Sequence, residues 1–174
     1  MHTQQKYKKC FITVGTTRFD LLCKRIQTPE VLRALNKLGC KEITFQIGNS
    51  DFEPGCYEKE GVKIELYRFK DSLKEDMQSA DLIISHAGAG SCLEALDEKK
   101  PLLVVINEDL MDNHQMELAE QLHMSGNLYY CTCDTLENTL ETVDFSWLRP
   151  LAEPVPHNLT KYLDKIFTVT KLHK

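Results

Sequence analysis

Residues 81–94 read Asp81-Leu-Ile-Ile-Ser-His86-Ala-Gly88-Ala-Gly90-Ser91-Cys-Leu-Glu94. The apolar start of this stretch predicts a buried strand, its glycines predict a turn, and the residues from Ser91 onward predict a helix. Gly88 and Gly90 let the backbone approach a ligand closely, and the following helix offers free main-chain N–H groups at the positive end of its dipole. The stretch therefore predicts a phosphate-binding turn between a strand and a helix.

Apolar, β-rich runs alternate with helical patterns along the rest of the chain. This alternation is typical of a parallel α/β sheet, so we predict one Rossmann-like domain. Helices are expected between most of the strands, which we place near residues 10–15, 42–48, 62–67, 81–85, 101–106 and 128–131.

Local signals mark the ends of several predicted elements. Thr28-Pro29 predicts the start of a helix that Gly39 ends. Ser72 and Glu75 have the spacing of a capping box at the start of the next helix. Residues 49–60 are expected to form the longest irregular loop before the C-terminal linker.

Composition limits the classes of function. The 174 residues are 42% hydrophobic and 27% charged, which is typical of a globular domain. The net charge of −5 argues against nucleic acid as a ligand. The longest apolar run, Leu102 to Ile106, is too short to cross a bilayer, and the N-terminus lacks the apolar core of a secretory signal. We therefore expect a cytoplasmic protein.

The seven cysteines are scattered and odd in number, unlike a secreted disulfide framework, so we interpret them as reduced thiols. Cys131-Thr-Cys133 has the wrong spacing for a zinc site and no second Cys/His pair at a suitable distance. No metal site is expected.

Candidate ligand-binding residues all follow predicted strands. The carboxyl ends of parallel strands share one edge of a sheet, where ligands bind. These segments are therefore expected to meet at a nucleotide site: Gly15-Thr16-Thr17, Arg68-Phe69-Lys70, residues 86–94 and residues 107–115.

Each of these segments also has a structural interpretation. The turn after the first strand lacks both the dinucleotide fingerprint and the P-loop lysine. The alternative interpretation of Thr16 or Thr17 is that it caps the next helix. Ser91 and Glu94 have the spacing of a capping box, and Asp112 with Gln115 resembles one.

The turn at residues 85–91 with Glu94, followed by Pro101, an apolar strand and residues 112–115, resembles the donor-binding half of GT-B glycosyltransferases. It is similar to the C-terminal domain of the bacterial enzyme that adds N-acetylglucosamine to the lipid-linked peptidoglycan precursor.

Two further motifs extend the resemblance over most of the chain, from Cys10 to about Tyr130: Val-Gly-Thr-Thr at 14–17 and Tyr-Arg-Phe-Lys-Asp-Ser-Leu at 67–73. With them the chain resembles the family of small catalytic subunits of two-part UDP-N-acetylglucosamine transferases, which act in dolichol-linked oligosaccharide synthesis.

The resemblance implies a role for each matching residue. Main-chain groups of Phe69 and Lys70 would contact uracil, and Glu94 would contact ribose. His86 would contact phosphate, and the alternative interpretation is that it only packs against its neighbours. Gln115 is the favoured sugar contact of the set Asn113, His114 and Gln115, because an amide both donates and accepts hydrogen bonds. The donor diphosphate would face Gly15, Thr16, Thr17, His86, Gly88, Ala89, Gly90 and Ser91.

The implied reaction transfers N-acetylglucosamine from UDP-GlcNAc to GlcNAc-diphosphodolichol and gives chitobiosyl-diphosphodolichol. UDP-GlcNAc is the donor substrate. No cofactor or metal is expected, because the chain lacks the Asp-x-Asp motif that carries a divalent ion in the other main transferase fold. The catalytic base is not identified in this chain and is expected on a partner.

A GT-B enzyme needs two domains around its cleft, and we predict only the donor-binding one, in residues 1–148. The partner is therefore expected to be a membrane-anchored subunit with the acceptor domain, which recruits this chain to the cytosolic face of the endoplasmic reticulum. Residues 149–156 predict a Pro-rich linker. Residues 157–174 predict an amphipathic helix that docks either on its own domain or on the partner.

Two other functions stay open. A non-catalytic regulatory subunit would bind a UDP-sugar without turnover when the partner is added. A different UDP-sugar enzyme of this fold, such as an epimerase or a glycolipid synthase, would need a second domain in the same chain.

Overall fold

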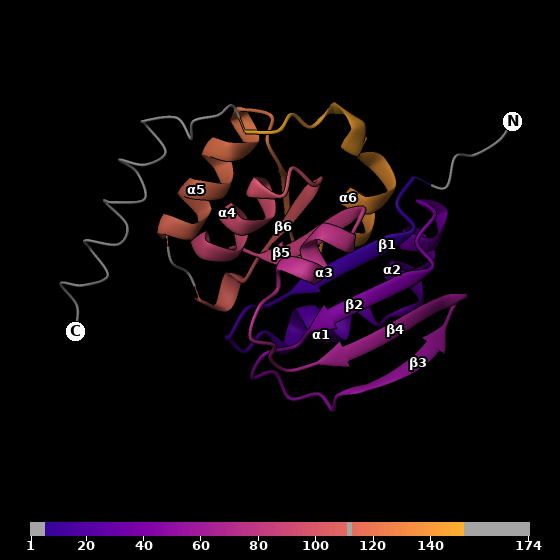
Figure 1. Ribbon diagram of the computed structural model, residues 1–174. Helices are drawn as coiled ribbons and strands as arrows, with labels where there is room; N and C mark the ends of the chain where they lie inside the picture. Colours follow the sequence, from indigo (N-terminus) through magenta and orange to yellow (C-terminus); the bar gives the residue numbers. More distant parts are fainter. Residues whose placement is uncertain (1–5, 111–112, 152–174) are drawn as a thin grey trace, which may run out of the picture.

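The computed structural model describes residues 6–110 and 113–151. Figure 1 shows a twisted sheet with helices on both sides. The strands are β1 (Lys9–Thr13), β2 (Glu42–Gln46), β3 (Gly55–Lys59), β4 (Val62–Tyr67), β5 (Leu82–His86), β6 (Leu102–Ile106) and β7 (Tyr129–Thr132). The helices are α1 (Asp20–Ile26), α2 (Pro29–Lys37), α3 (Lys74–Ser79), α4 (Ala89–Asp97), α5 (Asn113–Met124) and α6 (Leu136–Thr142), with 3-10 turns η1 (Glu108–Leu110) and η2 (Phe145–Trp147).

The strand order is β3-β4-β2-β1-β5-β6-β7, and every neighbouring pair except β3–β4 is parallel. Without β3, this is the order of a Rossmann-type sheet, in which successive strands are added on one side of β1 and then, from β5 onward, on its other side. The two strands at this point are β1 and β5, with Ile12 opposite Ile84. The predicted α/β class and all six predicted strands are confirmed.

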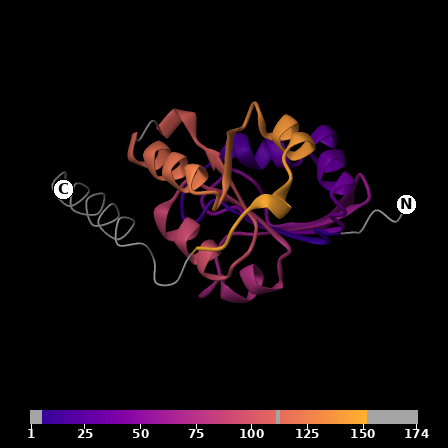
Figure 2. The same cartoon turned by 90° about the horizontal axis from the view of Figure 1, so that it is seen from above.

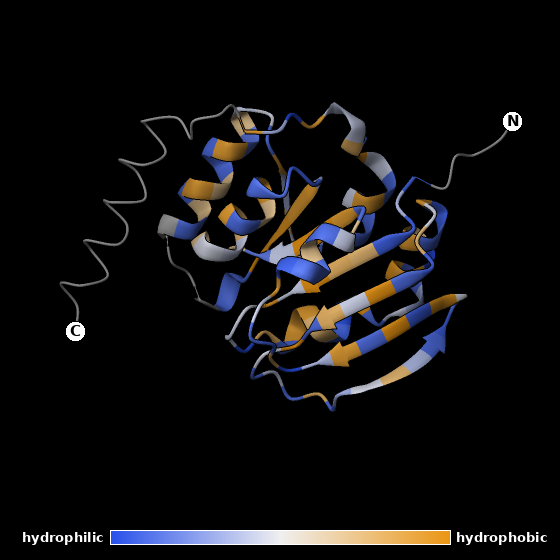
Figure 3. Ribbon diagram, viewed as in Figure 1, coloured by the Kyte–Doolittle hydropathy of each residue, from blue (hydrophilic) through white to orange (hydrophobic). Residues whose placement is uncertain are grey.

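Helices cover both faces of the sheet, as Figure 2 shows from above. Phe11 packs with buried residues of α3, α4 and α5 on one face. Its neighbours Cys10 and Ile12 point to the other face and pack with α1, α2 and α6. Because both faces are buried, β6 is wholly apolar and β1 and β5 each contain three consecutive apolar residues (Figure 3), and this explains the continuous apolar runs of the sequence.

The predicted start and end of α2 are confirmed. Thr28 is the N-cap, and its hydroxyl accepts a hydrogen bond from the N–H of Val31 at 3.5 Å. Gly39 follows the helix with φ +99°, a conformation that glycine adopts most readily.

The predicted capping box of α3 is wrong. The helix begins at Lys74 with Leu73 as N-cap, and no side chain caps it. The Ser72 hydroxyl accepts a hydrogen bond from the Lys74 N–H at 3.2 Å. Glu75 is only the second helical residue, whereas a capping box requires the third.

The prediction of an irregular loop over residues 49–60 is wrong at its C-terminal end. Residues 55–59 form β3, an antiparallel edge strand whose side chains are mostly exposed. Glu60 and Gly61, both with positive φ, form the two-residue turn to β4. An exposed edge strand needs no apolar run, and the sequence therefore carries no strong strand signal here.

All seven cysteines are free, and six of them are buried. Burial raises the pKa of Cys92 and Cys131 to about 12, so these thiols stay protonated. Cys131 and Cys133 belong to the apolar core. In residues 6–110 and 113–151 no helix is long and apolar enough to cross a membrane. The predicted helix 157–174 and most of the predicted linker lie outside these ranges.

Candidate functional site

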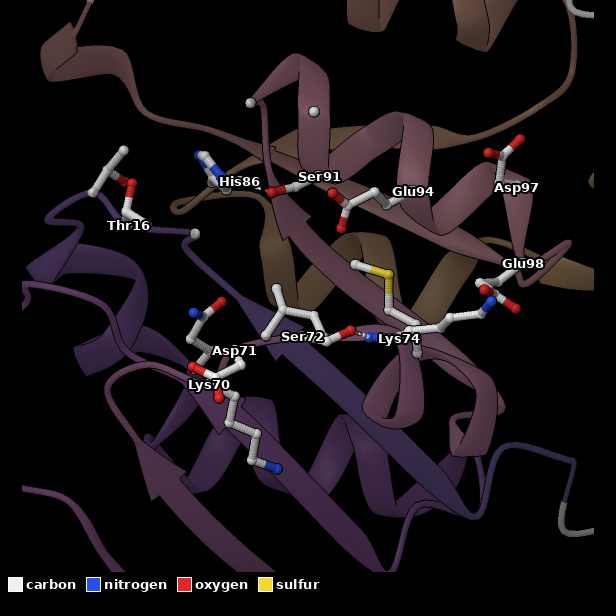
Figure 4. Close-up of a pocket in the computed structure, with 17 residues that line it drawn as sticks. Thr16, Lys70, Asp71, Ser72, Lys74, His86, Ser91, Glu94, Asp97 and Glu98 are labelled. Atoms are coloured by element: carbon white, nitrogen blue, oxygen red, sulfur yellow. Dashed lines mark hydrogen bonds between the residues drawn. The ribbon is translucent and has the colours of Figure 1, made fainter.

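A cleft of about 670 Å³ lies at the carboxyl edge of the sheet, where the turns after β1 and β5 meet. This is the point where the strand order reverses and at which Rossmann-type sheets bind ligands. Figure 4 shows the residues of α4 facing Thr16 and the segment from Lys70 to Lys74. The lining residues are Gly15, Thr16, Thr17, Gln46, Lys70, Asp71, Ser72, Leu73, Lys74, Met77, His86, Gly88, Gly90, Ser91, Glu94, Asp97 and Glu98.

The turn after β1 is held by side-chain hydrogen bonds, of which those of Thr13 are buried. The hydroxyl of Thr13 accepts from the Gly15 N–H at 2.9 Å and donates to Oε1 of Gln46 at 2.6 Å. The hydroxyl of Thr17 donates to the Val14 carbonyl at 2.7 Å. Neither Thr16 nor Thr17 caps the next helix, because α1 begins at Asp20 and no side chain caps it. The capping alternative for these threonines is therefore wrong.

Helix α4 begins at Ala89 with Gly88 as N-cap, and no side chain caps it. Ser91 is thus the third helical residue, so the interpretation of Ser91 and Glu94 as a capping box is wrong. The N–H groups of Ala89, Gly90 and Ser91 have no acceptor within the helix and form its positive end. This helix start can bind an anion in the cleft.

His86 lies between the two glycine turns. Its Nε2 is 3.3 Å from the Ser91 hydroxyl oxygen. A Cβ on Gly88 would lie 2.3 Å from Cε1 of the imidazole, and one on Gly15 would lie 2.8 Å from Nε2. His86 therefore packs against its neighbours and also lines the cleft, so its proposed contact with phosphate stays a prediction.

Burial also sets the charge of His86. It lowers the pKa of the imidazole from 6.5 to about 4, so the ring is neutral near pH 7. A neutral ring offers a phosphate at most one hydrogen bond and no positive charge.

The loop after β4 is anchored by its charged side chains. Lys70 Nζ contacts both carboxylate oxygens of Asp76, at 2.9 and 3.1 Å, and lies 4.3 Å from the centre of the Tyr67 ring. Its amino end points away from α4 (Figure 4). Phe69 is 50% exposed and does not line the cleft. The Lys70 ammonium group is therefore held by Asp76, while the segment from Lys70 to Leu73 lines the cleft.

The family of the chain follows from comparison with known proteins. A model of the glycosyltransferase family 28 C-terminal domain matches residues 9–166. The chain belongs to this family.

Curated relatives of this family 28 domain are named UDP-N-acetylglucosamine transferase subunit ALG13. The chain is 53% identical to the Mus musculus protein over 129 residues, which are 74% of this chain and 11% of that protein. It is 30% identical to the Saccharomyces cerevisiae protein over 185 residues, covering 87% of this chain and 91% of the relative. The chain therefore spans about a tenth of the mouse relative and most of the yeast one.

Solved structures show the same fold as this family 28 domain. An NMR solution structure of ALG13 matches with a TM-score of 0.66 and 25% identity, covering 89% of this chain and 93% of that one. A crystal structure of MurG from Acinetobacter baumannii matches with a TM-score of 0.60 and 21% identity, covering 81% of this chain and 42% of that one. The resemblance stated from the sequence is confirmed for the family and the fold.

The predicted residues of this family 28 domain do not all meet in the cleft. Ala89 packs partly against the core and does not line it. Gln115, in the first turn of α5, does not line it either. Asn113 and His114 begin α5, and their side chains lie outside the described part. Asp112, with its possible capping box, also lies outside it.

Sequence reasoning missed the far end of the cleft, where α3 and α4 face each other. Lys74 and Met77 of α3 line it together with Asp97 and Glu98 at the end of α4 (Figure 4). The available signal was the i, i+3 and i+4 spacing of Ser91, Glu94 and Glu98 along one helical face. In the described ranges no group of three or more His, Cys, Asp or Glu side chains could hold a metal.

Proposed function

We propose that this chain binds UDP-GlcNAc and supplies the donor site of a transferase that passes N-acetylglucosamine to GlcNAc-diphosphodolichol. The observation that carries the proposal is the uncapped start of α4 beside the turn of Gly15, at the reversal point of a family 28 domain. The name of its relatives, UDP-N-acetylglucosamine transferase subunit, supports the choice of donor.

In the proposed reaction an acceptor hydroxyl oxygen bonds to the anomeric carbon of the donor and gives up its proton to a catalytic base. The bond between that carbon and the β-phosphate oxygen breaks, and UDP leaves with the electron pair. Negative charge therefore grows on the diphosphate as the bond breaks. Main-chain N–H groups of Gly90 and Ser91, with the Thr16 hydroxyl, would stabilise this charge without a metal ion.

The remaining contacts with the donor nucleotide and sugar are assigned to α4, to the loop after β4 and to the start of α5. Glu94 lies on the cleft face one helical turn beyond Ser91, at a suitable distance from the phosphates to accept from ribose hydroxyls. The main chain of Phe69 and Lys70 would contact uracil, since the Lys70 ammonium is engaged by Asp76. Asn113, His114 and Gln115 would contact the sugar when the donor is bound.

A partner subunit completes this proposal. The acceptor is a membrane lipid, and we place the acceptor domain, the catalytic base and the membrane anchor on that partner, at the cytosolic face of the endoplasmic reticulum. Exposed apolar side chains in segments that begin at the carboxyl edge of the sheet support such a contact. Leu21, Phe69 and Met116 are large and at least 36% exposed, and they follow the carboxyl ends of β1, β4 and β6.

Transfer of labelled N-acetylglucosamine to the lipid acceptor tests the proposal, with membranes that carry the partner. Activity is expected only when both subunits are present. Glu94→Ala should weaken UDP binding about tenfold or more, because it removes a charge-assisted hydrogen bond. Glu30→Ala, on the exposed surface of α2, is the matched control and should leave binding unchanged.

Three results would contradict parts of this function. UDP binding without transfer in the presence of the partner would support the regulatory alternative. Full transfer without this chain would remove its catalytic role. Equal UDP binding by Glu94→Ala and the unaltered chain would reject the ribose contact.

A further inference from the structure

We propose that Arg68 is a positioning residue for nucleotide binding. It holds the base-facing loop 68–73 and the phosphate-facing turn 15–17 in one arrangement, through the loop 48–52 that lies between them. The inference rests on the proposed function, because both held segments belong to the same cleft.

Arg68 makes three hydrogen bonds to a single neighbouring loop. Its Nη1 donates to the carbonyl oxygens of Ser50 at 2.9 Å and Gly48 at 3.2 Å, and its Nη2 donates to that of Phe52 at 2.8 Å. These carbonyls lie 16 to 20 residues away in the sequence. The planar guanidinium fork suits several acceptors at once, whereas a lysine presents one compact ammonium group.

The loop 48–52 in turn contacts the turn after β1. The main-chain N–H of Asn49 donates to the Thr17 carbonyl at 3.0 Å, and its side-chain Nδ2 donates to the Thr16 carbonyl at 2.9 Å. Gly48 approaches this turn so closely that a Cβ there would lie 2.5 Å from the Thr17 carbonyl oxygen. A shift of the loop 48–52 would therefore move the carbonyls of Thr16 and Thr17.

The second anchor of the base-facing loop acts differently. Asp76 accepts hydrogen bonds from Lys70 Nζ and, at 2.6 Å, from the Tyr67 hydroxyl. These contacts attach the loop to α3, the helix that directly follows it. The contacts of Arg68 reach instead the loop that contacts the turn 15–17. Arg68 therefore joins two segments that would face opposite ends of a nucleoside diphosphate.

Arg68→Lys is the decisive variant because it keeps the positive charge and removes the fork. We expect it to weaken UDP binding about tenfold, within the usual range of coupling energies between contacting groups. We also expect faster amide hydrogen exchange at residues 15–17 and 69–72 of the free chain. The matched control is Arg33→Lys, an exposed arginine of α2 with ion pairs at 3.7 and 3.8 Å, which should change neither readout.

A double-mutant cycle with Asn49→Ala tests the connection itself. If Arg68 acts through the loop 48–52, the losses of UDP affinity in the two single variants should not add in the double variant. Strict additivity would overturn the coupling. Unchanged UDP affinity and exchange in Arg68→Lys, or a lower unfolding midpoint alone, would overturn the positioning role. If the unaltered chain binds no UDP, the proposed function fails, and any role of Arg68 in binding fails with it. Amide hydrogen exchange in Arg68→Lys would still show whether the two loops are coupled.

Discussion

The substitution Gly88→Ala tests whether the imidazole of His86 requires a glycine at the start of α4. Gly88 has φ −72° and ψ 127°, which any residue adopts, so the change introduces no backbone strain. The new Cβ would lie 2.3 Å from Cε1 and 2.7 Å from Nε2 of His86. The first distance is shorter than an ordinary carbon contact by about 1.2–1.7 Å.

The imidazole would have to move to relieve this contact. Ser91 and the backbone of Gly15 lie against its Nε2, so movement disturbs both turns of the cleft. Overpacking of this kind lowers the free energy of unfolding by about 1–3 kcal/mol. Urea unfolding measures that loss, and titration with UDP measures the accompanying loss of affinity.

Gly90→Ala is the matched control within the same turn. A Cβ on Gly90 meets nothing within 4 Å, and the residue is the second of α4. Alanine there should raise the free energy of unfolding by about 0.5–1 kcal/mol, because it lowers the entropy of the unfolded chain. The two alanine variants should therefore differ by about 1.5–4 kcal/mol.

Equal stability of the Gly88→Ala and Gly90→Ala variants would refute this reasoning. A double variant identifies the obstacle. In a His86→Ala background the alanine at position 88 no longer meets a ring, so Gly88→Ala should cost much less there than in the unaltered chain. An undiminished cost would show that something other than His86 limits this position.

Two further predictions concern the same turns. Because burial lowers the pKa of His86 to about 4, the unfolded chain binds the proton more readily, and stability that is complete above pH 6.5 is lost as the pH falls towards 4. Urea unfolding near pH 7 and near pH 5 should therefore show a smaller loss for His86→Gln than for the unaltered chain, and equal losses would contradict this. Thr13→Val removes the partner of both Gly15 and Gln46 and should lower the free energy of unfolding by about 1–3 kcal/mol, whereas a negligible loss would mean that water replaces the hydroxyl.

The parallel strands could be predicted because burial on both faces leaves an unambiguous pattern. β6 is wholly buried, and its sequence from Leu102 to Ile106 is wholly apolar. β3 has no such pattern, since its side chains are largely exposed and its strand character depends on pairing with β4. An edge strand of this kind is determined by a tertiary partner that local sequence does not reveal.

The positions of the glycine turns in the cleft could also be predicted, but not the directions of the side chains around them. Lys70 follows a strand at the cleft edge, yet its ammonium group is held by Asp76, six residues later. Arg68 was one of the candidate residues, and its partners are carbonyls of a loop expected to be irregular. Hydrogen bonds to main-chain carbonyls leave no signature in the identity of the accepting residues.

The error at the start of α4 bears directly on function. Ser91 at the N-cap would have used its hydroxyl to accept from a free N–H of the helix, and a ligand would have had to displace that bond. Gly88 takes the N-cap position instead and has no side chain to accept a hydrogen bond. The first N–H groups of α4 therefore stay free to donate to a ligand. Ser91, moved one turn into the helix, lies beside His86 on the wall of the cleft. Because α4 begins earlier than the sequence predicts, Ser91 and Glu94 do not cap the helix. They line one side of the anion site instead.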